Sequence, residues 1–518
     1  MSVDATGSSA TGEAGAVEVT LKVGQNKYLS ARPAPAGSHG RAEMHAMIEV
    51  GVRTGGHGPA PGRRGGTGAA LAEVLIVDTS KSMLHPETKL HAAKDATVAA
   101  IRLLPDGTAF AVLSGRFDAT VVHPGSGTEA LAVADPRERE SAEYAVRMLD
   151  ADGGTAIGPW LDLARRLLHG QDAPVKHVLL LTDGRNEHDD RTDKRLEKVL
   201  RACDGQFICD AWGIGDGWDA GVLLNVTDQL HGHAAAVRDE SELPLAYEEL
   251  MERLLGTALP EVRIRLVPTQ GTEIREVKQV VPSEQTLRPA GAEPRARGTE
   301  YVTRGWTDEV RHYQVVLAAD PAGRELGEDL QLAAVELLVP ETAAQVRLPG
   351  PEPILVHWTD NPDDVSRQHP GVARHLLYRQ SYEAVAEAYR AWLRGADGRV
   401  RASAELARAL SLADRLGDTR LRDELLRVVE RDVTPPHEVH IRDGLKHVDW
   451  QHLILSSSVT TPPEPGEAPG PAPGGPADPG PAGDDGGELV RCPTCEWLGP
   501  AGSRFCGGDC GEPLGEPA

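Results

Sequence analysis

The sequence predicts a multidomain protein built around a doubly wound, Rossmann-like α/β domain. Its 518 residues leave room for several domains. Strand and helix patterns alternate from residue 70 to residue 257, which is typical of a mostly parallel sheet with helices on both faces. Within this stretch a run of four aliphatic residues, 74–77, ends abruptly at Asp78. So short an apolar run indicates a strand that is buried on both faces of the sheet.

Polar residues follow this strand at alternate positions. Asp78, Ser80 and Ser82 come directly after the aliphatic run. Open α/β sheets bind ligands at the carboxyl ends of their strands, so we expect these side chains at a ligand site. Carboxylate and hydroxyl oxygens are hard donors that suit Mg²⁺ and offer little to a soft metal. The stretch therefore predicts a site for a small hard cation.

The remaining elements of the α/β domain follow from periodicity. Residues 88–104 carry apolar side chains three or four apart on one helical face. We expect further helices near 137–149, 157–169, 190–203, 219–230 and 240–256, and further strands near 108–114, 118–123, 178–182, 206–214 and 234–238.

The rest of the chain divides into regions of different composition. Short alternating segments over 260–358 predict an antiparallel β-sandwich, which the strands of residues 17–54 are expected to join, so that the α/β domain is an insertion. The predicted regions are a disordered N-terminus (1–16), a Gly/Pro-rich boundary (55–68), the α/β domain (70–257), a small α-helical region (370–432), a short β segment (437–455), a Pro/Gly-rich linker (462–488) and a zinc ribbon (490–514).

Two further motifs accompany the one at Asp78. Gly153-Gly154-Thr155 precedes a predicted helix, and Thr182-Asp183-Gly184 ends a predicted strand. With these three motifs in this order, the sequence over about 71–257 resembles the von Willebrand factor A family with its metal-ion-dependent adhesion site. The resemblance implies that Mg²⁺ or Mn²⁺ is bound by the hydroxyls of Ser80, Ser82 and Thr155, and by Asp78 and Asp183 directly or through water. An open position on the ion would then accept a carboxylate from a protein partner.

Other interpretations of these motifs are weaker. Ser80 or Ser82 alone is more simply a helix cap, and Asp78 a turn residue. Phosphoaspartate chemistry of the haloacid-dehalogenase kind needs a second aspartate two residues on, where this chain has Ser80. The sequence contains neither a nucleotide-binding Gly-x-x-x-x-Gly-Lys-Ser/Thr loop nor a Gly-x-Ser-x-Gly elbow. We therefore expect a protein that is not an enzyme.

Four of the six cysteines lie near the C-terminus. They form two pairs, Cys492-x2-Cys495 and Cys506-x3-Cys510, separated by ten residues. This pattern resembles a zinc ribbon, with four thiolates closing a structural Zn²⁺ site. Two disulfides are the alternative, disfavoured if the compartment is reducing. We expect Cys203 and Cys209 to be ordinary core residues.

Composition limits the classes of partner. The net charge of −24 argues against binding nucleic acid or an anionic membrane, both of which favour basic surfaces. The N-terminus lacks the features of a signal peptide, and no apolar run approaches the ~20 residues of a spanning helix. We therefore expect a cytoplasmic protein.

The architecture resembles bacterial cytosolic von Willebrand A proteins with a C-terminal zinc ribbon. That resemblance implies an adaptor in a stress-response or signalling system, with a Ser/Thr kinase, a PP2C-type phosphatase or a phosphopeptide-binding protein as partner. An alternative is a subunit that assists an AAA+, chelatase-like ATPase; a surface adhesin is a third. Thr460 and Thr461 lie directly before the linker. The simpler interpretation is that they form the polar end of a strand, and the alternative is that one of them is phosphorylated.

Overall fold

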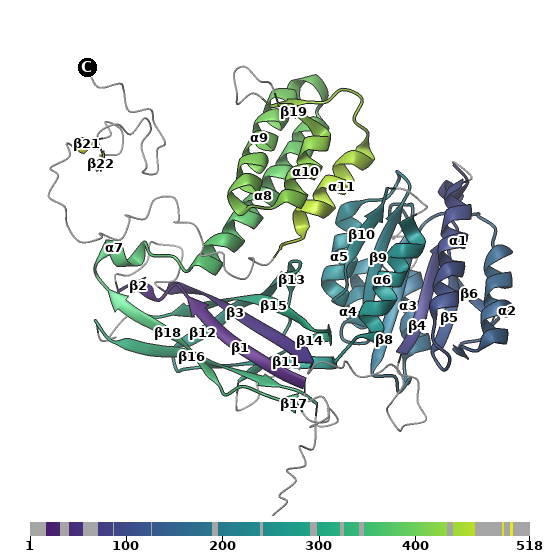
Figure 1. Cartoon of the computed structure of the whole chain (residues 1–518), viewed down its shortest axis with the longest axis horizontal. Coiled ribbons are helices and arrows are strands. Elements are labelled where there is room, and N and C mark those ends of the chain that lie inside the picture. The colour runs from purple at the N-terminus through teal and green to yellow at the C-terminus, as the bar shows by residue number, and fades with distance from the viewer. Residues whose placement is uncertain are drawn as a thin grey trace, which may run out of the picture.

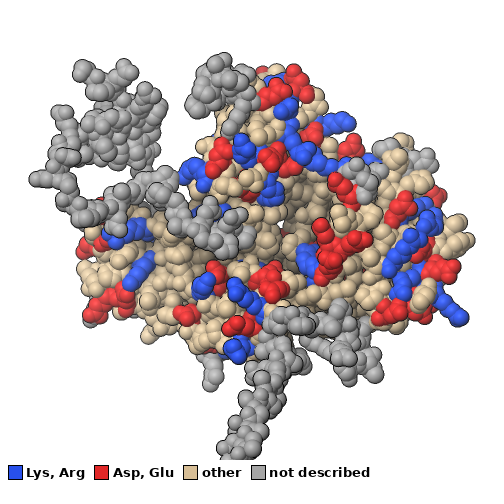
Figure 2. Space-filling model, in the orientation of Figure 1, with Lys and Arg blue, Asp and Glu red and all other residues tan. Residues whose placement is uncertain are grey.

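The computed structural model contains an α/β unit, a pair of β-sheets and a helical region (Figure 1). It describes residues 17–31, 41–54, 71–85, 88–125, 127–188, 195–238, 242–290, 298–321, 326–340, 346–431 and 439–461, and the backbone of two short strands, 489–491 and 498–500. Figure 2 shows acidic and basic side chains interspersed on the visible face, with neither sign gathered into one large patch.

The α/β unit has a sheet ordered β10-β9-β8-β4-β5-β6, with β7 also paired to β5. All neighbours from β10 to β5 are parallel, and β6 is antiparallel. Its strands are β4 (Leu71–Asp78), β5 (Ala109–Gly115), β6 (Ala119–His123), β7 (Ala132–Val133), β8 (Val175–Thr182), β9 (Ile208–Ile214) and β10 (Ala234–Val237). Its helices are α1 (Thr88–Leu103), α2 (Pro136–Arg147), α3 (Ile157–Leu168), α4 (Leu196–Cys203), α5 (Ala220–Leu230) and α6 (Leu243–Leu255).

Strand β4 is central and fully buried. Its alternate residues enter different cores, because successive side chains of a strand point to opposite faces. Val74 and Ile76 pack in the core that contains α3 to α5, whereas Leu75 and Val77 pack in the core that contains α1, α2 and α6. Helices therefore cover both faces of the sheet, and the functional end of β4 emerges from the middle of the unit.

Two further sheets share one core. The first is ordered β13-β12-β15-β3-β1-β17 and the second β14-β11-β16-β18-β2. Strand β3 pairs antiparallel with β15, and β2 pairs with β18, so the segments before and after the α/β unit belong to the same sheets. Their strands are β1 (Val17–Gln25), β2 (Tyr28–Ser30), β3 (Ala42–Thr54), β11 (Leu259–Pro268), β12 (Thr272–Val281), β13 (Gln285–Thr286), β14 (Thr299–Trp306), β15 (Glu309–Ala319), β16 (Asp329–Leu338), β17 (Val346–Arg347) and β18 (Glu352–Thr359).

The helical region contains α8 (Pro370–Trp392), α9 (Arg399–Leu416), α10 (Thr419–Val428) and α11 (His447–Ser458), after the one-turn helix α7 (Pro362–Val365). The expectation of a short β segment over 437–455 is wrong for most of that stretch. Among the described residues of that stretch, only β20 (Val439–Ile441), paired with β19 (Val429–Arg431), is a strand. Trp450 and Leu453 are buried three residues apart in the helical core, a spacing that fits a helix.

Helix α11 also contacts the α/β unit. The side chain of Gln451 accepts a hydrogen bond from Ala220 N at 2.7 Å, at the start of α5. Leu455 belongs to the core of the α/β unit, and Figure 1 shows α11 beside α5 and β10. The helical region and the α/β unit are thus packed together near one end of the parallel sheet.

Hydrogen bonds fix the residues that follow α11 to neighbouring parts of the fold. Val459 forms an isolated bridge with Ser283, and Thr460 N donates to Pro282 O at 2.8 Å. The Thr460 side chain is buried and its hydroxyl donates to Val280 O, while Thr461 Oγ1 lies 2.7 Å from the Tyr378 hydroxyl. The expectation of a polar strand end is therefore wrong, because these residues follow the helix α11 and form only an isolated bridge. A kinase would have to open these contacts to reach Thr460.

Several expectations fall on other parts of the chain. The N-terminus (1–16), the linker (462–488) and the cysteines Cys492, Cys495, Cys506 and Cys510 lie outside the described residues. Within the ribbon region, β21 (Leu489–Arg491) and β22 (Leu498–Pro500) pair antiparallel. Cys203 and Cys209 are buried and free, and burial raises the pKa of the Cys203 thiol to about 12. None of the helices among the described residues has the length and apolarity to cross a membrane.

Candidate metal centre

Three loops meet at the carboxyl end of the parallel sheet. The first follows β4 and contains the short 3₁₀ helix Lys81–Leu84, the second precedes α3, and the third follows β8. Backbone hydrogen bonds join the first two: Asp152 N donates to Thr79 O at 2.8 Å, and Lys81 N donates to Gly153 O at 3.1 Å. Gly153 has φ +79°, a left-handed conformation that glycine adopts without strain.

Asp78 is completely buried at the end of β4. Its Oδ1 accepts a hydrogen bond from Ser80 N at 2.8 Å, and its Oδ2 accepts one from the Thr182 hydroxyl at 2.6 Å. The carboxylate is therefore fixed in orientation by the loop after β4 and by β8. Thr182 was not among the predicted site residues, although its place between the apolar strand and Asp183 was visible in the sequence.

The two serines and the second aspartate form a chain of contacts. Ser80 Oγ lies 2.9 Å from Ser82 Oγ, and the Ser82 hydroxyl donates to Asp183 Oδ1 at 2.7 Å. Asp183 is fully buried. Residues about a hundred positions apart in sequence thus share one polar cluster.

Thr155 completes the cluster at a gap beside Gly184. A Cβ atom on Gly184 would lie 2.7 Å from Thr155 Oγ1 and 3.5 Å from Asp78 Oδ2. The Thr155 hydroxyl and the Asp78 carboxylate therefore border the same small space, which glycine leaves open. All five predicted residues, Asp78, Ser80, Ser82, Thr155 and Asp183, are brought together here.

The donor set fits a hard divalent cation. It comprises three hydroxyls and two carboxylates, and no sulfur or imidazole takes part. Burial, followed by the nearby charge of Asp183, raises the pKa of Asp78 to about 6. A bound cation would offset both effects, because it favours the ionised carboxylate. The described residues contain no cluster of three or more His, Cys, Asp or Glu side chains that could hold a metal, so hydroxyls would have to supply part of the coordination.

A buried lysine also reaches this cluster. Lys89 Nζ lies 3.1 Å from Asp183 Oδ2 and 3.2 Å from Asp216 Oδ1. Burial alone would lower the pKa of the Lys89 ammonium, but the two carboxylates outweigh that effect and raise it. Lys89 was not among the predicted site residues, although its position four residues before the buried Ala93 places it on the buried face of α1.

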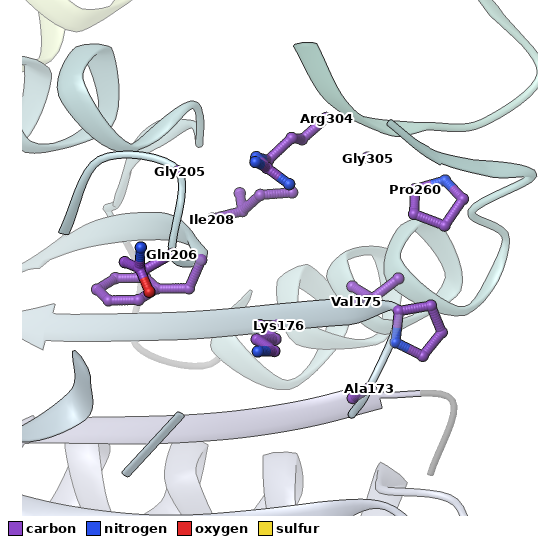
Figure 3. A pocket seen from close by; sticks show the side chains of 11 residues that line it. Ala173, Val175, Lys176, Gly205, Gln206, Ile208, Pro260, Arg304 and Gly305 are labelled. Carbon is purple, nitrogen blue, oxygen red and sulfur yellow. The ribbon is translucent and has the colours of Figure 1, made fainter. Parts of the chain in front are cut away.

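Two cavities lie away from this cluster, at the seam between the α/β unit and the β-sheets. One, of about 140 Å³, is bordered by the starts of β8 and β9 and by Pro260, Arg304 and Gly305 (Figure 3). The other, of about 340 Å³, shares Gly205, Gln206 and Arg304 with it. Neither is lined by a residue of the polar cluster, so the geometry of the cluster itself, rather than cavity size, marks the candidate site.

Comparison with known proteins agrees with this architecture. Residues 72–236 match the model of the von Willebrand factor type A domain. A von Willebrand factor type A structure from Catenulispora acidiphila is 30% identical, with a TM-score of 0.73, over 87% of this chain and 99% of that one. The chain belongs to the von Willebrand factor type A (VWA) family.

Two other proteins are also similar to this chain. Uncharacterized protein sll0103 of Synechocystis sp. is 27% identical over 207 residues, which is 40% of this chain. The match spans about half of that relative, 47% of its length. The ArnB paralog VWA2 of Sulfolobus acidocaldarius is 14% identical, with a TM-score of 0.48, over 85% of this chain and 98% of that one.

The gap beside Gly184 yields a direct prediction. Gly184→Ala is expected to weaken Mg²⁺ binding roughly tenfold or more, because the new methyl group would occupy the space between Thr155 and Asp78. The φ of Gly184 lies outside the left-handed region, so alanine fits the backbone. Isothermal titration with Mg²⁺ measures the effect, and Gly350→Ala, with no heavy atom within 4 Å of the added Cβ, is the control. Equal affinities in the two variants would contradict the assignment of this gap.

Proposed function

We propose that this VWA protein is a non-enzymatic, metal-dependent adaptor that binds a protein partner through Mg²⁺ or Mn²⁺. Ser80, Ser82 and Thr155 would hold the ion through their hydroxyls, with Asp78 and Asp183 bound directly or through water. The observation that carries the proposal is the buried cluster of three hydroxyls and two carboxylates around the gap at Gly184. With few carboxylates, such a site leaves the ion electrophilic toward a carboxylate of the partner.

The surroundings of the cluster support a protein ligand. Arg185, directly after Gly184, lies 2.9 Å from His447 of α11, and His447 in turn lies 2.7 Å from the Tyr389 hydroxyl of α8. The helical region therefore borders the loop that carries Asp183. A partner that places a carboxylate on the ion would also meet side chains of α8 and α11, and these would add specificity to the contact.

The cysteine pairs Cys492/Cys495 and Cys506/Cys510 would form a Zn²⁺ ribbon that supplies a second contact. On this proposal the protein works in the cytoplasm of a bacterium, beside a Ser/Thr kinase or PP2C-type phosphatase. Contact with an AAA+, chelatase-like ATPase is the alternative. The interspersed surface charges in Figure 2 show no large basic patch on that face, which fits a protein partner better than nucleic acid.

Affinity capture from a lysate of the source bacterium tests this function. The full chain is immobilised in Mg²⁺ or in EDTA and compared with Asp78→Ala and with Asp172→Ala, which removes an exposed carboxylate. We expect a partner that is retained by the wild type and Asp172→Ala in Mg²⁺, and lost in EDTA or with Asp78→Ala. A kinase or phosphatase would support the leading proposal, and an ATPase ring the alternative. Partners that bind equally in all four conditions would contradict metal-dependent capture.

A further inference from the structure

Lys89 occupies an unusual position for a lysine. It lies in the first turn of α1, and only 6% of its side chain is exposed. Its ammonium group stands between two carboxylates, the fully buried Asp183 and the 57% exposed Asp216. Burying an ammonium costs free energy even when carboxylates pair with it, so packing alone does not explain this arrangement.

The loop after β9 is shaped around this side chain. Gly215 has φ +71°, and a Cβ there would lie 2.6 Å from Lys89 Cε. A Cβ on Gly217 would lie 2.6 Å from Asp183 O. Two glycines on either side of Asp216 thus let the loop lie flat against the lysine stem and against the backbone of Asp183. Lys89 of α1 is therefore in contact with the loop after β8 and with the loop after β9.

Both carboxylate oxygens of Asp183 accept hydrogen bonds in this arrangement. Its Oδ1 accepts from Ser82 and its Oδ2 from Lys89. A divalent cation held by the same cluster would repel the ammonium that Asp183 binds, because both groups are positively charged. Asp216 lies almost as close to Lys89 Nζ as Asp183 does, so the lysine has a second partner without changing its position.

We propose that Lys89 is an internal counter-ion that Asp183 and Asp216 share when the cluster holds no metal, and that Lys89 keeps only its contact with Asp216 when a divalent cation binds. Lys89 is thus a positioning residue that sets the affinity of the cluster for its cation, and it rests on the metal site proposed above. Without Lys89 the cluster of Asp78 and Asp183 carries two formal negative charges, whereas with it the cluster carries one. The lysine stabilises the metal-free cluster and makes cation binding weaker and more readily reversed.

Asp216, the second partner of Lys89, lies on a loop that also contacts the helical region. Two residues after Asp216, the buried Trp218 packs its ring against His452 of α11 at a centroid distance of 5.2 Å. Two residues further, Ala220 N donates to Gln451 of α11. A change in the Lys89–Asp216 contact therefore occurs on the loop that docks α11, beside the surface offered to a partner.

Titration of the full chain with Mg²⁺ and Mn²⁺ tests this role, with calorimetry for affinity and thermal melting for stability. Lys89→Met is compared with Lys81→Met, which removes the same charge from an exposed side chain near the cluster. We expect Lys89→Met to bind Mg²⁺ roughly tenfold or more tightly than the wild type, since the repulsion is gone. We expect Lys89→Met to melt at a lower temperature without metal and to show a larger rise in melting temperature on metal addition. Lys81→Met should change both quantities little.

The outcomes separate the two proposals. Metal binding by the wild type with no gain of affinity in Lys89→Met would overturn the role of Lys89 and leave the metal site standing. Binding by Lys89→Met alone would overturn both proposals for the native chain, because Lys89 would then exclude the cation instead of yielding Asp183 to it. No binding by any variant would overturn both. If Lys89→Met fails to fold, Lys89→Gln keeps a polar side chain of similar length, and the same gain in affinity is expected.

Discussion

Replacing Asp78 with asparagine is expected to weaken Mg²⁺ binding by about 100-fold or more while leaving the metal-free protein folded. The carboxylate sits at the centre of the cluster, between Ser80 N and the Thr182 hydroxyl. Burial and the charge of Asp183 already raise the pKa of Asp78, so its ionised form is held at a cost when no cation is present. The isosteric amide removes that cost together with the charge on which the cation depends.

Calorimetry and thermal melting of the same preparations measure the two effects. Asp172→Asn, at an exposed position, controls for the loss of one negative charge. A variant that keeps wild-type Mg²⁺ affinity would show that Asp78 has only a structural role at the end of β4. A metal-free variant that fails to fold would show instead that the buried charge is needed for stability.

A second large effect is expected at a buried charged network at the opposite end of the sheet. His177 Nδ1 lies 2.9 Å from both carboxylate oxygens of Glu73, and His177 Nε2 lies 3.5 Å from Asp210 Oδ2. Asp210 is also paired with Arg253 of α6 and accepts a hydrogen bond from His233 N at 2.6 Å. The network ties β4, β8 and β9 to the last helix of the VWA domain, directly before the chain enters the β-sheets.

His177→Leu is expected to lower the free energy of unfolding by about 3–5 kcal/mol, because it leaves the Glu73 carboxylate buried without its partner. Burial alone would lower the pKa of His177, but the charges and hydrogen bonds of Glu73 and Asp210 outweigh it and raise the pKa to about 9. The charged imidazolium therefore stabilises the fold fully below its ordinary pKa of about 6.5, and this stabilisation is lost as the pH rises through about 9.

Urea unfolding at several pH values measures both parts of this prediction. Between about pH 7 and 9 the wild type should lose stability, and His177→Leu should lose much less. Glu73→Leu/His177→Leu should recover part of the stability, since an apolar pair leaves no buried charge without a partner. His169→Leu, at an exposed histidine, is the control. Equal pH slopes in the wild type and His177→Leu would contradict the assigned charge of His177.

The sequence predicted the residues of the polar cluster better than the residues around it, for a physical reason. Asp78, Ser80 and Ser82 follow a strand whose apolar run is unmistakable, and parallel strands bring Asp183 to the same edge. Lys89 was missed because a lysine on an amphipathic helix ordinarily lies at the surface. Its buried position depends on Gly215 and Asp216, which lie more than a hundred residues away and approach only in the folded chain.

The buried charged network and helix α11 were also not predicted, because both depend on contacts between distant parts of the chain. Glu73, His177 and Asp210 lie on three different strands, and nothing local shows that these positions face one another. Helix α11 looked like a β segment because Val448 and Trp450, and Leu453 and Leu455, stand at alternate positions. Its helical form is favoured by Asp449, whose carboxylate accepts from Lys446 N at 2.8 Å, and by burial of Trp450 against the other helices.

The position of a bound ion is the most direct test of the proposed metal site. Crystals of the full chain grown with Mn²⁺ and measured at the manganese absorption edge should show one anomalous peak within coordination distance of Ser80, Ser82 and Thr155, about 2.0–2.3 Å for oxygen ligands. The same crystals should show Lys89 Nζ nearer to Asp216 than to Asp183. Absence of a peak at this cluster at saturating Mn²⁺, with a peak elsewhere or none at all, would contradict the account.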